Sequence, residues 1–325
     1  MGHRLPPGGE QLKGNRRDRS RRFADDRAGS EVVGALILFG LFVGVIALLN
    51  TTAVPQAGLT NEVGHFDTVV DRLNGLQASA EAAGTPGFEG ATVSAAVPLG
   101  PPRSVGQDFF SYFMGTPARA AGSLDFVASY GNITLYHYAS GNPTPVVDVG
   151  NLTARLPLGR LTFNQNPYFR NEAAATLENG AVILDEGATP TLRYDPPITV
   201  NVSGGVTHLT VKTRLLAGVN QSVGGTADVR VGLLAAAATL DTPVSANAER
   251  TVLRLETAYG SAWGSYLNAT AAEAGLLAGS GYTTVVSPGA GEGGLDVVTW
   301  TVLGTGAGND IRLVSGLAVY EPRFS

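Results

Sequence analysis

Histidines, serines and glycine-rich loops are the groups that could support chemistry in this chain, and none has the spacing of a catalytic or metal site. The histidines lie far apart, at His3, His65, His137 and His208, so no H-x-x-x-H pair is available to hold a metal ion. The chain has no cysteine, which excludes thiol nucleophiles and thiolate metal ligands, and it has no G-x-S-x-G motif. We therefore predict no catalytic residue, no metal site, no cofactor and no enzymatic activity.

One glycine-rich segment formally matches the dinucleotide-binding pattern G-x-G-x-x-G, at Gly289, Gly291 and Gly294. That pattern binds phosphate only where a helix follows it, because the helix N-terminus supplies the N–H groups that contact the phosphate. Here residues 295–300 alternate in the manner of a strand. We interpret the segment as a hairpin loop.

N-x-[ST] sequons are the more informative motif. Six of them, none with proline in the middle position, begin at Asn50, Asn132, Asn151, Asn201, Asn220 and Asn268. Asn50 adjoins the apolar run described next, so the other five are the candidate N-glycosylation sites, and they predict an exported domain. The alternative is that Thr-rich strands generate sequons through their composition alone.

An uncharged apolar run, Val32–Leu49, is the strongest signal in the chain. As a helix rising 1.5 Å per residue, its eighteen residues would extend about 27 Å, enough to cross the hydrocarbon core of a bilayer. A buried core helix or a removable secretory signal is the alternative, but a signal's apolar region is usually about 7–15 residues long, and no A-x-A-like site follows promptly.

Charge asymmetry sets the orientation. Residues 1–29 carry eight Lys and Arg side chains and four acids, a net charge of +4, whereas the remaining residues carry a net charge of −9. Because basic segments beside a membrane span stay in the cytoplasm, we predict a cytoplasmic leader and an extracellular C-terminal domain. The acidic body excludes nucleic acid as a partner.

The next segment, residues 51–87, is predicted as a linker and an amphipathic stalk helix. Within Leu59–Ala83 the apolar side chains recur at spacings of three and four, and Thr60 with Glu62 resembles a helix start. The apolar positions are Val63, Phe66, Val69, Val70, Leu73 and Leu76. This stripe is expected to pack on the body of the domain, with self-association as the alternative.

Residues 88–325 are predicted to form a β-rich extracellular domain. Short apolar or alternating runs are separated by Gly and Pro, and the Asn179-Gly180 pair predicts a tight hairpin turn. The candidate strands are residues 91–99, 123–129, 132–138, 160–163, 174–177, 181–185, 198–202, 208–216, 227–234, 251–257, 283–286, 295–302 and 311–320. One segment, Ser261–Ala274, has the pattern of a helix instead. The fold class is therefore mainly β: an N-terminal transmembrane α-helix (residues 30–50) followed by an all-β, sandwich-like ectodomain with one or two short helices.

The leader junction resembles the class III signal of archaeal type IV pilin-like proteins and archaellins. In those families a short basic leader ends in a small residue and is removed on the cytoplasmic side, while the apolar helix remains in the mature protein. The resemblance implies cleavage between Gly29 and Ser30. Gly34, Leu36, Ile37 and Phe39 then match the family's Gly-x-Leu-Ile-x-Phe pattern.

The same resemblance implies helix packing through the apolar segment. Gly40 and Gly44 form a G-x-x-x-G pair that permits close approach of helices, although glycine is common in membrane helices. Bacterial pilins carry a glutamate at the fifth mature position, whereas this cleavage places Glu31 at the second. The body, including the stretch from Leu177 to Ile183 and the helix around Trp263, is similar to haloarchaeal pilin-like secreted proteins.

Two functions follow as expectations. The first is a pilin-like structural subunit of the cell surface, anchored or assembled through its N-terminal helix, with a prepilin peptidase and homo- or hetero-oligomers as partners and a surface filament as its location after processing. The alternative is an uncleaved single-pass signal-anchor protein whose sandwich ectodomain binds a glycan or another cell-surface partner. Both are single-pass proteins of the cell membrane.

Overall fold

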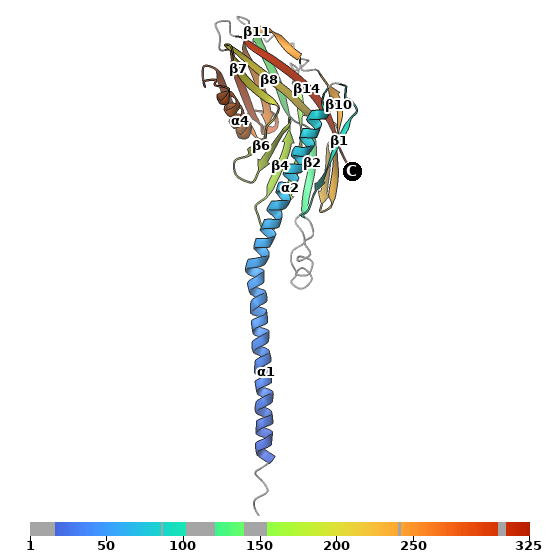
Figure 1. The fold of residues 1–325 in the computed structure, drawn as a ribbon, viewed down its shortest axis with the longest axis vertical. Coiled ribbons are helices and arrows are strands. Elements are labelled where there is room, and N and C mark those ends of the chain that lie inside the picture. The colour runs from blue at the N-terminus through green and yellow to red at the C-terminus, as the bar shows by residue number, and fades with distance from the viewer. Residues whose placement is uncertain (1–16, 86, 102–120, 140–154, 240–241, 305–309) are drawn as a thin grey trace, which may run out of the picture. The chain divides into compact units, whose positions relative to one another are not determined.

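The computed structural model describes residues 17–85, 87–101, 121–139, 155–239, 242–304 and 310–325. The chain divides into two compact units, Met1–Gly58 and Leu59–Ser325 (Figure 1). The first unit is helical where it is described, and the second is built mainly from strands. The predicted fold class is therefore confirmed at the level of a long apolar N-terminal helix followed by a β-rich domain.

The described N-terminal part of the chain contains three helical elements in direct succession: α1 (Arg17–Leu48), the π-helical turn η1 (Leu49–Ala53) and α2 (Val54–Ala83). Residues 51–58, expected as a linker, are thus helical, and Thr60 does not begin a helix. The π-turn lies just before Pro55, which has no N–H to donate to the preceding turn. Hydroxyl groups bond to backbone carbonyls here instead, as when Thr52 Oγ1 donates to Leu48 O at 2.7 Å.

The ectodomain strands follow the predicted order, with two additions and one fusion. The runs expected at 123–129 and 132–138 form one strand, and the strands at 191–194 and 221–225 were not predicted. The strands are β1 (Thr92–Pro98), β2 (Ala121–Ala139), β3 (Leu156–Asn166), β4 (Ala173–Glu178), β5 (Ala181–Asp185), β6 (Thr191–Tyr194), β7 (Ile198–Ser203), β8 (Val206–Leu216), β9 (Gln221–Gly225), β10 (Asp228–Ala238), β11 (Thr242–Thr257), β12 (Tyr282–Ser287), β13 (Asp296–Leu303) and β14 (Ile311–Phe324).

These strands form one branched sheet of 14 strands within the described residues. Its longest path runs β1-β10-β14-β11-β2-β3-β4-β5-β6, and the remaining strands branch from it. Neighbouring strands are antiparallel except for β8 and β14, which run parallel. Helix α4 (Gly260–Glu273) joins β11 to β12 and confirms the helix predicted at Ser261–Ala274, whereas η2 (Glu292–Gly294) is a single 3₁₀ turn in the glycine-rich loop. That loop connects β12 to β13, so it is a hairpin connection as predicted.

The predicted Asn179-Gly180 turn joins β4 to β5. Both residues have positive φ angles, 47° for Asn179 and 78° for Gly180, as a type I′ hairpin requires. The turn is buried, and the side-chain oxygen of Asn179 accepts a hydrogen bond from the backbone N–H of Arg214 at 2.9 Å. The local sequence signal is therefore confirmed.

Two hydrophobic cores stabilise the ectodomain. The first, the α2 core, places one face of helix α2 against residues of β1, β2, β3, β4, β5, β10 and β14 (Figure 1). Of the six predicted stripe residues of α2, only Val63 is substantially exposed, at 41%. Tyr320 on the last strand also donates its hydroxyl to Ala80 O at 2.6 Å. The stalk helix thus packs on the body of the domain, as expected.

The second core, the α4 core, lies under helix α4. It contains both tryptophans of the chain, Trp263 on α4 and Trp300 on β13, and each is completely buried. Strands β7, β8, β11 and β14 contribute aliphatic side chains to it. Gly264 allows α4 to lie close to β12, because a Cβ there would come within 2.7 Å of Val286.

Truncation of the α2 stripe should destabilise the ectodomain. Leu73 has no exposed surface, so Leu73→Ala is expected to lower the free energy of unfolding by about 2–5 kcal/mol through lost burial and a residual cavity. The measurement is chemical denaturation of the full chain in detergent. Leu59→Ala is the matched control, because Leu59 lies on the same helix but is 42% exposed. Equal losses in the two variants would contradict the packing.

Candidate functional site

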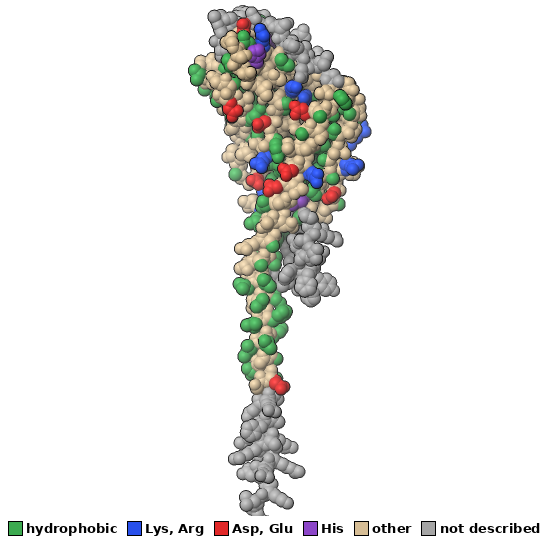
Figure 2. Space-filling model, in the orientation of Figure 1, with side chains coloured by type: hydrophobic (Ala, Val, Ile, Leu, Met, Phe, Trp, Pro, Cys, Tyr) green, Lys and Arg blue, Asp and Glu red, His purple; other side chains and the backbone are tan. Residues whose placement is uncertain are grey.

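Helix α1 exposes its apolar side chains on every side. Figure 2 shows hydrophobic side chains distributed along its described length. Apart from the half-buried Ile46, the large apolar residues from Val32 to Leu48 expose between 46% and 68% of their surface, the highest value being that of Leu38. This helix is long and apolar enough to cross a membrane, as predicted. A helix that is apolar all round requires lipid or protein on all its faces.

The residues implied by the resemblance all lie on α1. The Gly29–Ser30 bond is inside the helix, so a peptidase acting there would need the helix to unwind locally. Glu31 is exposed. A Cβ placed on the glycines of this segment would meet no atom of the chain within 4 Å, and these glycines are Gly34, Gly40 and Gly44. No contact with another described residue therefore requires glycine at these positions.

Helix α2 holds a loop of the ectodomain through Glu62. This carboxylate is 3% exposed and accepts the backbone N–H groups of Tyr168 and Phe169, at 2.7 Å and 3.0 Å. The loop is held further by Arg170, whose guanidinium lies over the ring of Phe66 at 4.8 Å. A carboxylate that accepts two N–H groups of successive residues fixes the loop backbone, and this clamp was not predicted from the sequence.

His65, one turn along from Glu62, belongs to the same buried contact. Its Nε2 lies 3.0 Å from Pro98 O, which can only accept, so Nε2 carries the proton. Its Nδ1 then accepts from the side-chain amide of Gln165, at 3.4 Å. Burial lowers the pKa of His65 below its usual value, although Pro98 O and the carboxylates of Asp228 and Glu62 oppose the shift. Both ring nitrogens of His65 are thus engaged in contacts within the protein.

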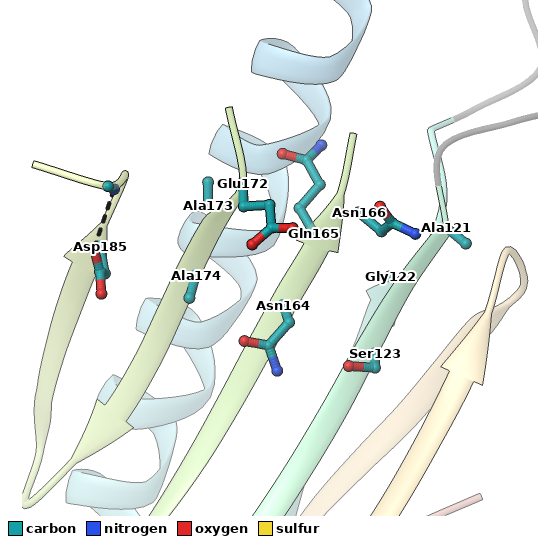
Figure 3. A pocket seen from close by; sticks show the side chains of 11 residues that line it. Ala121, Gly122, Ser123, Asn164, Gln165, Asn166, Glu172, Ala173, Ala174 and Asp185 are labelled. Atoms are coloured by element: carbon teal, nitrogen blue, oxygen red, sulfur yellow. Dashed lines mark hydrogen bonds between the residues drawn. The ribbon is translucent and has the colours of Figure 1, made fainter. Parts of the chain in front are cut away.

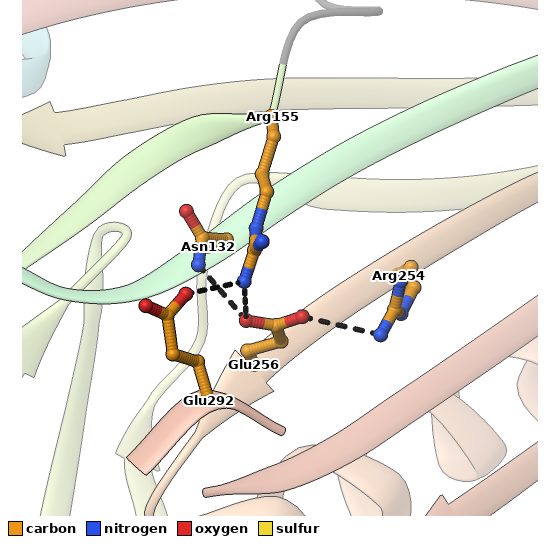
Figure 4. Close-up of polar contacts among 5 residues, drawn as sticks. All are labelled: Asn132, Arg155, Arg254, Glu256 and Glu292. Carbon is orange, nitrogen blue, oxygen red and sulfur yellow. Dashed lines mark hydrogen bonds and ion pairs between the residues drawn. The ribbon is translucent and has the colours of Figure 1, made fainter. Parts of the chain in front are cut away.

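A charged cluster on the ectodomain converges on Glu256 (Figure 4). Arg155 donates to Glu256 Oε2 at 2.8 Å and pairs with Glu292 as well, while Arg254 approaches Glu256 Oε1 at 3.1 Å. Asn132 Nδ2 donates to Glu256 Oε2 at 2.8 Å. Burial alone would raise the pKa of Glu256, but the Asn132 amide and the two guanidinium groups hold it below its usual value.

The candidate glycosylation sites fall in different environments. The Asn132 amide nitrogen, the atom that would carry a glycan, is occupied by the Glu256 contact. Asn201 on β7 and Asn268 on α4 are exposed. Asn220 is also exposed. Its side-chain oxygen accepts a hydrogen bond from Ala128 N at 2.8 Å, and this bond does not involve the side-chain nitrogen that would carry a glycan. Asn151 lies outside the described residues. The structure does not bring these sites together.

A polar trough lies on the sheet face opposite α2 (Figure 3). It has a volume of about 640 Å³, within the range of small-ligand sites. Its floor includes one row of paired positions across four strands, formed by Ser123, Asn164, Ala174 and Asp185. Glu172 and Asn166 line the trough too, and none of the lining residues that the structure describes is aromatic.

Asp125 fixes the polar groups at one side of the trough. Its Oδ2 accepts from Ser123 Oγ and from Asn164 Nδ2, each at 2.9 Å, and its Oδ1 accepts from Ser222 Oγ. The side chains of Ser123 and Asn164 are therefore held in place before any ligand arrives. Alternation along each strand indicates which of these residues share a face, but only the strand register places them in one row.

The histidines remain separate, as the sequence spacing predicted. His65 and His137 are buried in different parts of the ectodomain, and His208 lies on β8. His3 is outside the described residues. In the part of the chain that the structure describes, no group of three or more histidine or acidic side chains is arranged to hold a metal ion.

The Glu62 clamp gives a direct test. Glu62→Gln keeps the size of the side chain but turns an NH₂ group toward one of the two N–H donors, so we expect a loss of about 1–3 kcal/mol in the free energy of unfolding. Hydrogen exchange should also become faster at the amides of Tyr168 and Phe169. Glu81→Gln is the control, since Glu81 is exposed on the same helix. Unchanged exchange at both amides in Glu62→Gln would refute the clamp.

Comparison with known proteins adds no assignment. No protein-family model matches the chain, and no curated protein or solved structure is significantly similar to it. The functional conclusion therefore depends on the residues and on their geometry.

Proposed function

We propose that this protein is a pilin-like structural subunit of the cell surface that is anchored, and after processing assembled, through helix α1. The observation that carries the proposal is the exposure of α1, whose large apolar side chains from Val32 to Leu48 are 46–68% exposed with the single exception of Ile46. Burying such a helix requires lipid, copies of the same helix, or lipid first and other copies after assembly. The basic leader orients it with the ectodomain outside the cell.

Glycines in α1 support assembly between helices. Each glycine in a helix interior costs about 1 kcal/mol relative to alanine, and no contact among the described residues requires Gly34, Gly40 or Gly44. Gly40 and Gly44 lie on one face because they are four residues apart. Close approach of a second helix at that face would explain why small residues are kept there.

The ectodomain suits an exposed structural role. We propose that its branched sheet folds over as a sandwich-like body, which the presence of two separate cores on different faces of the sheet supports. Its sequons at Asn201, Asn220 and Asn268 are exposed, as glycan acceptors must be.

Processing and assembly can be tested together in the native host. Mass spectrometry of the mature protein should find an N-terminus at Ser30, and sheared surface material should contain the chain. Gly44→Ile should remove the protein from sheared filaments while it remains in the membrane, because a branched side chain keeps the helices apart.

Ala35→Ile is the matched control, because Ala35 lies roughly opposite the Gly40–Gly44 face at 100° per residue. It should assemble normally. A mature chain that retains residues 1–29 would refute the processed subunit and favour an uncleaved signal anchor. Equal assembly of both isoleucine variants would refute packing through Gly44.

The trough favours a second function, binding of a neutral glycan by an uncleaved anchor protein. Carboxylates and amides, such as Glu172, Asp185 and Asn164, bind sugar hydroxyls well, and the two acids disfavour anionic sugars. The small side chain of Ala174 leaves room above the floor. The described lining residues offer hydrogen-bonding groups and no aromatic ring, so binding to them would depend on hydrogen bonds.

This second function predicts measurable binding of neutral oligosaccharides. Ligand-observed NMR with maltotriose, cellotriose and chitotriose should give a Kd below about 1 mM for at least one of them, equivalent to about −4 kcal/mol. Ala174→Trp should fill the trough and weaken that binding at least tenfold, whereas Ala96→Trp, at an exposed position on β1, should not. If none of the three sugars binds the unmodified chain, the glycan function is abandoned.

A further inference from the structure

Glu178 is a buried acid that joins three elements of the ectodomain. It is the last residue of β4 and has no exposed surface. Its Oε1 accepts two hydrogen bonds, one from the hydroxyl of Thr257 at the end of β11 (2.7 Å) and one from the indole Nε1 of Trp263 on α4 (2.9 Å). The carboxyl group therefore ties the first turn of α4 to the sheet.

The second oxygen of Glu178 has no such partner. Oε2 is buried without a hydrogen bond among the described groups. Arg160 lies directly opposite on β3, but its guanidinium stacks on the ring of Tyr130, 3.3 Å from the centroid, and forms no ion pair with Glu178 among the described side chains. A negative charge on Glu178 is therefore held in the core with only partial compensation.

The groups around this carboxyl come from several elements. Arg160 faces it from β3, Tyr130 from β2 and Tyr259 from the segment that precedes α4. Helix α4 itself contributes only the neutral indole of Trp263. Burial raises the pKa of Glu178 to about 7, although the bonds from Thr257 and Trp263 and the charge of Arg160 oppose this shift.

We propose that Glu178 is a proton-controlled latch, which holds helix α4 firmly on the sheet when it is neutral and loosens that helix when it is ionised. The neutral acid accepts both hydrogen bonds without placing a charge in the core. When the acid is ionised, lifting of the first turn of α4 lets water reach Oε2 and solvate the negative charge, which lowers the free energy of the open state. The latch acts within the ectodomain and does not depend on assembly through α1.

The sign of the pH dependence follows from the shift. The pKa is about 7 in the closed state and 4.5 for an ordinary glutamate, so closure is favoured most below pH 4.5 and the advantage is lost as the pH rises to about 7. The difference of 2.5 units corresponds to a change on the order of a hundredfold in the opening equilibrium of α4. Above pH 8 the equilibrium should no longer change through this group.

Hydrogen exchange of the full chain in detergent tests the latch. After correction for intrinsic exchange, protection of the α4 amides should fall on the order of a hundredfold between pH 5 and pH 8. Glu178→Gln keeps an oxygen for Thr257 and Trp263 but cannot ionise, so its α4 protection should be independent of pH. Glu273→Gln, at an exposed position on α4, is the matched control and should keep the full pH dependence.

A second variant keeps the proposal testable if Glu178→Gln does not fold. Thr257→Val removes one donor to the carboxylate, so ionisation becomes harder and the midpoint of the transition should move to higher pH. In a Trp300→Phe background, Trp263 is the sole tryptophan and its fluorescence reports that midpoint. Constant α4 protection from pH 5 to 8, an unshifted midpoint in Thr257→Val, or a persisting transition in Glu178→Gln would each overturn the latch.

Discussion

The β4–β5 hairpin is buried on both of its faces, and most of the ectodomain depends on this constraint. Val182 and Ile183 are neighbours on β5 and point to opposite faces, yet both have no exposed surface. Val182 belongs to the α2 core and Ile183 to the α4 core. A sheet that is apolar on both faces needs a covering layer on each. Helix α2 and helix α4 are therefore not accessories of an all-β domain, because each helps to bury one face of this hairpin.

Local pattern was sufficient to place most strands, but it could not reveal where separate strands approach each other. The bounds of β5 and the turn at Asn179-Gly180 were predicted correctly, because both depend on neighbouring residues alone. Strand β2 was expected as two strands, at 123–129 and 132–138, and Gly131 lies between them. The structure gives a reason for this glycine: a Cβ there would lie 1.9 Å from Glu256 O on the adjacent strand β11. A glycine required for close packing and a glycine required for a turn look the same in sequence.

The candidate sites were less predictable than the fold, because polar contacts between distant segments have no period. Glu62 was taken as part of a helix start, but it lies inside α2, four residues before Phe66 on the buried stripe. An acidic residue on the apolar face of a helix indicates a buried hydrogen-bond partner, but the sequence does not identify that partner. Here it is a loop about a hundred residues away. The trough also depends on residues that are distant in sequence, because strand register alone places Asn164 and Asp185 in one row. The apolar length of α1, by contrast, is a local property, and it could be read directly.

The chain has no cysteine, so no disulfide bond holds helix α2 on the sheet, and this attachment depends on noncovalent packing. Helix α2 is fixed at two separated places, by Glu62 at one end and by the bond from Tyr320 to Ala80 at the other. Between them the stripe residues from Phe66 to Leu76 are buried, so the contact extends over several turns of helix. Tyr320 lies on β14, so the C-terminal strand of the sheet helps to hold helix α2 in place. Separating helix α2 from the sheet would expose the apolar side chains of the α2 core to water, and this cost holds the helix where no disulfide bond does.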